Sequence, residues 1–198
     1  MKIHFLQMRT LCQVALVIWI FLDGCTSQPP GNIYGSQQSE YGITIVNGPR
    51  QGYQFTDSTG TNFHYRYITS TITNDTLVPV EVQIDFSKSG ASDSTSRVFL
   101  LPRNLAPDNL EYGDTMPGKL KGFLNSLAGK SFALNKTLKP QEHCVMTFGV
   151  LTETRYQDRF KIQLIAARED NAILSLFLSL DRTGFIPCGS ILYTDAKH

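Results

Sequence analysis

The chain has 198 residues, a formal net charge of +1 at pH 7 and 18% charged residues. This length suits a single domain with a sizeable core. The near balance of charges, without a lysine-rich or arginine-rich block, excludes a surface built to bind nucleic-acid phosphates or anionic lipid headgroups. No nucleic-acid partner is therefore expected.

Residues 1–24 have the order of an export signal. Lys2 and Arg9 lie in a charged start, and an apolar run from residue 11 to residue 22, interrupted by Gln13, follows it. This run is too short to cross a bilayer core, which takes about 20 apolar residues. The segment is therefore predicted to be removed after export, which leaves a mature chain with equal numbers of basic and acidic side chains.

The apolar run ends in Leu22, Asp23, Gly24 and Cys25. These residues resemble the lipobox of bacterial lipoproteins, in which a leucine three residues before the cysteine and a small residue just before it precede diacylglyceryl transfer to the thiol. Asp23 departs from the pattern, which usually has a small uncharged residue there. The resemblance implies a lipid, such as palmitate, attached at Cys25 and a mature chain that starts there.

The same resemblance implies a location. A lipid at Cys25 would hold the chain at a membrane of the bacterial cell envelope. Thr26 is not the aspartate that retains some lipoproteins in the inner membrane, so the outer membrane is favoured. Two alternatives stay open: plain secretion after cleavage near Ser27, and an N-terminal segment that is structural.

Residues 26–40 are polar, with Pro29, Pro30, two glycines and three glutamines, and have neither helical nor strand periodicity. Together with Cys25 they are predicted to form a flexible tether, residues 25–40, between the lipid and the folded domain.

From residue 41 to residue 198 the dominant pattern is alternation of apolar and polar side chains. Such alternation puts one face of a strand in a core and the other in water. Strands are predicted at residues 43–46, 64–73, 80–86, 97–101, 144–150, 160–166, 172–180 and 188–193, with a weaker one at 53–55. Turns are predicted at 74–76, 168–171 and 181–184.

This arrangement favours an all-β domain, an antiparallel two-sheet sandwich of about seven or eight strands, over a closed barrel. The stretch TITNDTLVPVEVQIDFS resembles the second and third strands of immunoglobulin-like domains in exported bacterial proteins. That resemblance implies a fold and no function.

Residues 102–130 depart from the strand pattern. Leu120, Phe123, Leu124 and Leu127 recur at helical spacing, in a helix that would begin at Pro117 and end at Gly129. This insertion is either a cap on the sandwich or a device for binding. The cap is favoured because the apolar stripe is ordinary for a side that faces a core, and burial of the four apolar side chains would identify it.

Cys144 and Cys188 are the cysteines left in the folded part once Cys12 and Cys25 are set aside. Two cysteines in an exported chain indicate a disulfide, which would stabilise the fold by about 4 kcal/mol in the chain-entropy model. The alternative is a pair of buried free thiols, since a sequence does not place their Cα atoms within bridging distance.

No motif for chemistry fits. His143 and Cys144 are adjacent, so on a strand they face opposite sides and form no thiolate-imidazole pair. The stretch from Gly129 to Ser131 lacks the earlier glycine of a phosphate-binding loop. Neither H-E-x-x-H nor C-x-x-C occurs, so no catalytic residue, metal ligand or cofactor is predicted.

The resulting expectation is a lipid-anchored, non-enzymatic module that binds another envelope protein or a glycan, or has a structural role, through its sheet edges or its insertion. The alternative is a lipoprotein that binds carbohydrate on a platform made by Tyr65, Tyr67, Tyr112 and Tyr156, or that hydrolyses it with two acids held across a cleft. The adjacent acids Glu169 and Asp170 lie in a predicted turn, where solvation explains them. A third is an adhesin-like secreted domain without lipid. The N-x-T patterns at Asn74 and Asn135 are read as turn residues.

Overall fold

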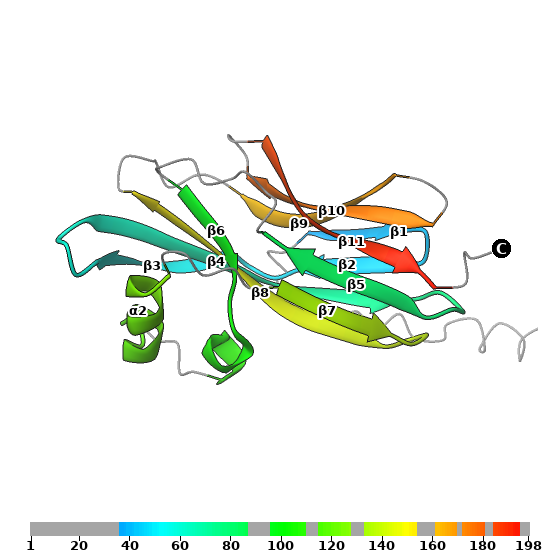
Figure 1. The fold of residues 1–198 in the computed structure, drawn as a ribbon, viewed down its shortest axis with the longest axis horizontal. Helices are drawn as coiled ribbons and strands as arrows, with labels where there is room; N and C mark the ends of the chain where they lie inside the picture. The colour runs from blue at the N-terminus through cyan, green and yellow to red at the C-terminus, as the bar shows by residue number, and fades with distance from the viewer. Residues whose placement is uncertain are drawn as a thin grey trace, which may run out of the picture. The chain divides into compact units, whose positions relative to one another are not determined.

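The structure is a computed structural model that describes residues 36–86, 96–109, 115–127, 133–153, 161–169, 172–180 and 184–194. Every described residue lies in one compact unit, Ile33–His198. Cys25 and the predicted signal peptide lie outside the described residues. The described chain is mostly strand, in two antiparallel sheets with one short α-helix (Figure 1). The predicted all-β sandwich is confirmed.

Sheet A has six strands. They are β1 (Gln37–Glu40), β2 (Ile43–Asn47), β3 (Gln51–Thr56), β4 (Asn62–Asn74), β6 (Ser96–Leu100) and β8 (His143–Glu153). Their order is β1-β2-β4-β8-β6, and β3 also pairs with β4. The long strand β4 therefore has two strands on one side, β2 along its second half and β3 along its first half.

Sheet B has five strands, in the order β7-β5-β11-β10-β9. They are β5 (Val80–Asp85), β7 (Ala133–Leu138), β9 (Ile162–Arg168), β10 (Ile173–Leu180) and β11 (Gly184–Tyr193). The turn from β4 into β5 is held by Asn74, whose side-chain Nδ2 donates to the carbonyls of Val78 (2.8 Å) and Leu138 (3.0 Å). This asparagine is fully buried at the end of β4. The other asparagine interpreted as a turn residue, Asn135, lies within β7, so that interpretation is wrong for it.

The core lies between the sheets and follows the alternation read from the sequence. Val80, Val82 and Ile84 on β5 are fully buried, while the residues between them are partly exposed. On sheet A the inward positions include Ile68, Ile72 and Phe148. A strand places residues i and i+2 on one face, so each of these runs supplies one wall of the core.

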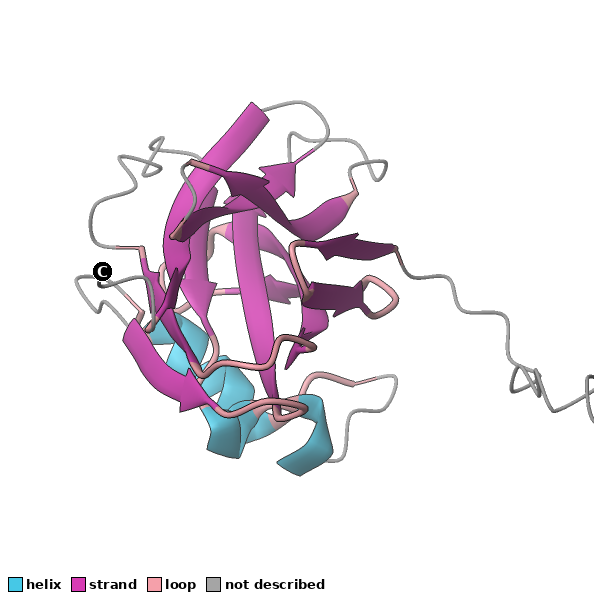
Figure 2. Cartoon of the chain, turned by 90° about the vertical axis from the view of Figure 1, so that its right-hand side faces the viewer, coloured by secondary structure: helices cyan, strands magenta, loops and turns pink. Residues whose placement is uncertain are grey.

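A second apolar layer covers the opposite face of sheet A. Its sheet residues come from β3, β4, β6 and β8, and its cover is the insertion: the 3₁₀ segments η1 (Arg103–Leu105) and η2 (Pro107–Asn109) and the helix α2 (Gly118–Asn125). Figure 1 places α2 beside β3 and β4, and Figure 2 shows the helical segments together on one side of the strands. Leu120, Leu124 and Leu127 are buried, and Phe123 is partly buried against the same layer. The interpretation of the insertion as a cap is confirmed.

The helix is shorter than predicted. It begins at Gly118, directly after Pro117, and ends at Asn125, where Ser126 leaves the helical conformation and its N–H bonds the carbonyls of Phe123 and Leu124. The end predicted at Gly129 falls on residues outside the described ones.

Two strands were absent from the sequence-based prediction, and one of them changes a boundary. Residues 37–40, assigned to the tether, form β1 and pair with β2. The tether prediction is therefore wrong for this stretch, and the domain begins before residue 41. The other missed strand is β7, which pairs with β5 at the edge of sheet B.

The predicted disulfide is absent from the structure. Cys144 on β8 and Cys188 on β11 are both buried free thiols in the core between the sheets. Each thiol packs as a small apolar side chain in that core, Cys144 from sheet A and Cys188 from sheet B. Burial raises the pKa of the Cys144 thiol to about 11 and that of the Cys188 thiol to about 12, so both are neutral.

Candidate functional site

The outer edge of β3 is an open backbone edge beside a cavity. Gly48 N–H donates to the carbonyl of Thr69 at 2.8 Å, which shows that odd-numbered residues of β4 direct their backbone groups towards β2 and β3. Their register partners on β3 are Tyr53 and Phe55. The alternate residues Gly52, Gln54 and Thr56 therefore direct N–H and C=O away from β4. In the described part of the chain, β3 pairs with β4 alone.

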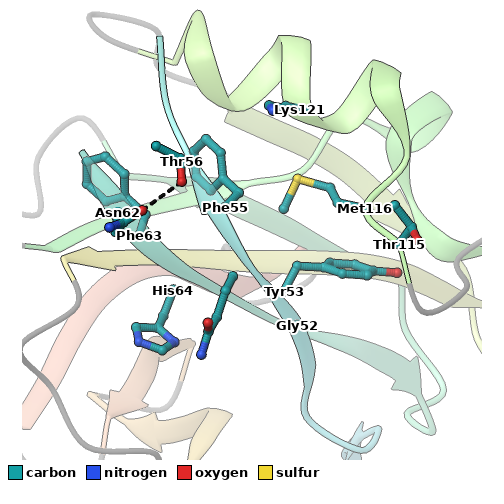
Figure 3. Close-up of a pocket in the computed structure, with 11 residues that line it drawn as sticks. Gly52, Tyr53, Phe55, Thr56, Asn62, Phe63, His64, Thr115, Met116 and Lys121 are labelled. Carbon is teal, nitrogen blue, oxygen red and sulfur yellow. Dashed lines mark hydrogen bonds between the residues drawn. The ribbon is translucent and has the colours of Figure 1, made fainter. Parts of the chain in front are cut away.

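A hollow of about 770 Å³ lies along this edge and extends to the insertion. Its walls come from β3, from the start of β4 and from the segment that leads into α2 (Figure 3). The lining residues are Gly52, Tyr53, Gln54, Phe55, Thr56, Asn62, Phe63, His64, Thr115, Met116 and Lys121. This feature is called the β3 groove below.

The two sides of the β3 groove differ in polarity. On the side of the cap, Phe55 stacks on Phe63 with ring centroids 5.6 Å apart, and Met116 packs against the same apolar layer. On the other side lies His64, which is 9% exposed. Figure 3 shows Met116 and Lys121 on the helix side of the strand and His64 on the far side. A groove of this kind offers an apolar wall and a polar wall to alternate side chains of an extended ligand.

Charge at the β3 groove is positive. Lys121 is exposed at its rim, and no Asp or Glu is among the described residues that line it. Behind the strand, the Arg66 guanidinium donates from Nη1 to the carbonyls of Tyr65 (3.2 Å) and Tyr53 (3.5 Å). Its Nη2 lies 3.4 Å from Nδ1 of His64. Arg66 therefore fastens β3 to β4 on the inner side of the edge.

The hairpin between β3 and β4 is held by its own side chains. Asp57 Oδ1 accepts hydrogen bonds from Thr59 Oγ1 (2.7 Å) and from the N–H groups of Thr59 (2.8 Å) and Thr61 (2.9 Å). The bond from the Thr59 hydroxyl is the main reason that the pKa of Asp57 lies below its usual value. Thr56 Oγ1 donates to Asn62 Oδ1 at 2.6 Å. The open edge is thus presented by a hairpin with a fixed tip.

The β3 groove supplies backbone donors and acceptors with flanking walls. Its side chains include one imidazole and one ammonium, and His64 lies next to Arg66 rather than next to a nucleophile. In the described part of the chain, no three His, Cys, Asp or Glu residues are grouped so that they could hold a metal ion. What this arrangement can do is hydrogen-bond to an extended chain, as sheet edges do when they take up a peptide strand.

The structure separates the site residues predicted from the sequence. Cys144 and Cys188 lie in the core, and Cys25 lies outside the described residues. Tyr65 and Tyr67 stack on each other at 5.5 Å and are buried beneath the cap, so the predicted tyrosine platform is wrong for these two. Tyr112, Tyr156 and Asp170 fall outside the described residues, and Glu169 is exposed after β9.

Sequence reasoning missed the β3 groove. The alternation of Tyr53 and Phe55 with Gly52, Gln54 and Thr56 was readable, and it indicated a weak strand. The pattern did not show that this strand lies at a sheet edge, because that depends on its register with β4. It also did not show that Met116 packs beside the strand, because that depends on how the insertion folds back.

Among the described residues, no helix is long and apolar enough to cross a membrane. No known protein family matches this chain, and a search of curated proteins found no match either.

Proposed function

We propose that this protein is a lipid-anchored, non-enzymatic binding module of the bacterial cell envelope, and that the β3 groove takes an extended segment of a partner protein as an added strand. The observation that carries the proposal is the outward direction of the N–H and C=O groups of Gly52, Gln54 and Thr56 along a hollow with an apolar wall. The lipobox-like end at Cys25 supports the anchor, and the outer membrane is the proposed location.

The binding mode follows from the geometry of the edge. A segment beside β3 would pair its backbone with up to three residues of the strand, and each such bond contributes about 1 kcal/mol net. Its alternate side chains would face Met116 on one side and His64 on the other. Backbone pairing would supply affinity, and the two unlike walls would supply specificity.

A protein segment is favoured over a glycan as the partner. Sugar binding at a β-sandwich would call for flat aromatic rings open to solvent, and the rings of Tyr65 and Tyr67 are buried under the cap. The exposed large apolar side chains among the described residues are Tyr41, Leu77, Val145 and Phe185, which lie on different elements.

The binding half of the proposal is tested with a random-peptide phage library selected on the full-length protein in detergent. Selected peptides are expected to lose binding about tenfold or more to Gln54→Pro, which removes an outward N–H. Gln54→Ala is the matched control, because it changes the side chain and keeps that N–H. Equal binding to all three proteins would overturn strand addition at β3.

The anchor is tested separately, by intact mass and palmitate labelling of the protein expressed in a bacterial host. We expect the mature chain to start at Cys25 with added acyl mass, and a Cys25→Ser variant to lack that added mass. A mature start near Gln28 without acyl mass would overturn the lipid anchor and leave the binding test unaffected.

A further inference from the structure

A second open backbone edge lies on the opposite side of sheet A, where β6 ends before β8 does. β6 pairs with β8 from Thr152 to Phe148, and the last bond runs from Leu101 N–H to the carbonyl of Thr147 at 2.8 Å. The chain then turns away into η1. β8 continues to His143, so among the described residues no strand lies beside its edge from His143 to Val145.

The backbone groups of this edge point outward. Asn74 N–H donates to the carbonyl of Glu142 at 2.9 Å, so even-numbered positions of β8 bond to β4. His143 and Val145 therefore direct N–H and C=O to the side that β6 has left. Lys136 of β7 reaches that side, since its Nζ donates to the carbonyl of His143 at 3.4 Å. The Val145 side chain is 49% exposed.

A hollow of about 470 Å³ lies at this edge, between the end of β6, β7 and β8. Apolar side chains such as Leu101, Leu134 and Met146 line it. Three basic side chains also line it, Arg103, Lys136 and His143, and no Asp or Glu is among its described lining residues. It is called the β8 slot below.

The carboxylate adjacent in sequence does not line the β8 slot, although its charge reaches Cys144, one of the lining residues. Glu142 lies in the turn between β7 and β8, and its Oε2 accepts the N–H of Lys139 at 2.9 Å. The Glu142 carboxylate is therefore held in that turn by a hydrogen bond, and Glu142 is not among the residues that line the slot. The charged side chains of the lining, Arg103 and Lys136, are complementary to an acidic ligand.

We propose that the β8 slot is a second binding site, which takes an extended, acidic segment of a partner protein. The segment would lie where β6 would have continued, with its backbone paired to Val145 and acidic side chains towards Arg103 and Lys136. Arginine binds carboxylates in a bidentate geometry, which fixes orientation as well as charge. Exposed ion pairs contribute little each, so backbone pairing and charge are both needed.

This site is independent of the β3 groove. The order of sheet A places β3 and β6 on opposite sides of the pair β4-β8, so a segment in one site does not occupy the edge of the other. The two sites also differ in their lining, since the β3 groove has aromatic walls and the β8 slot has three basic groups.

The test selects a random-peptide phage library on full-length Gln54→Pro protein in detergent, so that the β3 groove is disabled. The expected peptides carry Asp or Glu at alternate positions and bind at least about tenfold more weakly to Lys136→Glu. Lys119→Glu, an exposed position on α2, is the matched control for the same change of charge and is expected to bind normally. Enrichment of neutral or basic peptides, or no enrichment, would overturn the proposal.

A second variant separates strand pairing from charge alone. Val145→Pro removes the outward N–H of Val145, while Val145→Ala keeps it. Selected peptides are expected to lose about tenfold in affinity to the proline variant relative to the alanine variant. If polyglutamate displaced the peptides and both Val145 variants bound equally, the slot would be a site of ion pairing only, and strand addition there would be wrong.

Discussion

The side-chain amide of Asn47 on β2 replaces a neighbouring strand for Leu164 on β9. Asn47 Nδ2 donates to the carbonyl of Leu164 at 3.0 Å, and its Oδ1 accepts the N–H of Leu164 at 2.8 Å. Gln38 on β1 repeats this pair two residues along, with Ala166 as partner at 2.7 and 3.0 Å. Two amides from sheet A thus satisfy the edge of sheet B, where β9 would otherwise present open backbone groups.

Asn47→Ala is predicted to destabilise the domain by about 2–4 kcal/mol, because it leaves the backbone N–H and C=O of Leu164 without their partners in a buried place. Asn47 is 2% exposed, and its Oδ1 also accepts the Ser70 hydroxyl at 2.8 Å. Urea unfolding of the parent and variant measures the change. Gln38→Ala is the comparison, with a smaller loss expected because Gln38 is only part-buried. Equal losses in the free energy of unfolding for Asn47→Ala and Gln38→Ala would contradict the prediction that Asn47 contributes more.

Gly149→Ala is predicted to destabilise the domain by about 1–3 kcal/mol through overpacking. A Cβ at Gly149 would lie 2.5 Å from two atoms of the Phe99 ring and 3.0 Å from the Tyr65 ring. The measurement is a double-mutant cycle with Phe99→Leu, which removes the clashing ring atoms. The glycine substitution should cost less in the leucine background. A purely additive result would mean that the ring moves aside without strain.

Stability at alkaline pH is predicted to depend on the two thiols. Burial raises the pKa of Cys144 to about 11 and that of Cys188 to about 12, from the ordinary thiol value of 9.0. Above pH 9 the unfolded chain therefore loses thiol protons that the folded chain keeps, and the free energy of unfolding falls as pH rises towards 11. A variant with Cys144→Ala and Cys188→Ala should show a shallower fall than the parent protein.

Burial of the Cys144 and Cys188 thiols also predicts that they react slowly with alkylating reagents. Iodoacetamide at pH 8 should leave Cys144 and Cys188 unmodified in the folded protein and modify both in urea without any reductant, as read by peptide mass spectrometry. A requirement for reductant in urea would show a disulfide and would restore the pairing predicted from the sequence.

Two substitutions in α2 are predicted to act in opposite directions. Leu120→Ala should cost about 2–5 kcal/mol, because Leu120 is fully buried against sheet A. Gly122→Ala should add up to about 1 kcal/mol of stability, since Gly122 is exposed in the helix and a Cβ there meets no atom within 4 Å. Thermal unfolding of both variants checks the signs. A loss from Gly122→Ala would mean that this face of α2 contacts something unseen.

Much of the fold could be predicted from the sequence, because alternation at β5, β8 and β9 reports directly which side chains face a core. β1 escaped prediction for a physical reason. Its sequence, QQSE, has no apolar alternation, and it is held by pairing with β2 and by the amide of Gln38, neither of which is a local pattern. β7, at the edge of sheet B, buries only Leu138 and has a weak pattern for the same reason.

The sites could not be predicted, since they depend on where strands end relative to their neighbours. The β8 slot exists because β6 stops at Leu100 while β8 continues to His143, and no residue in either strand encodes that difference alone. The disulfide could not be judged from the sequence either, because spacing along the chain does not say how far apart β8 and β11 place the Cα atoms of Cys144 and Cys188.

The amide contacts of Gln38 and Asn47 with β9 have a mechanical consequence. If the chain is held at Cys25, tension on the anchor enters the domain at β1, its first strand. Gln38 and Asn47 transmit that force to sheet B through their hydrogen bonds with β9. The turn after β1 is also attached to sheet B, because the Tyr193 hydroxyl donates to the carbonyl of Tyr41 at 2.9 Å. Pulling on the anchor would then strain both sheets together, instead of peeling β1 away from β2.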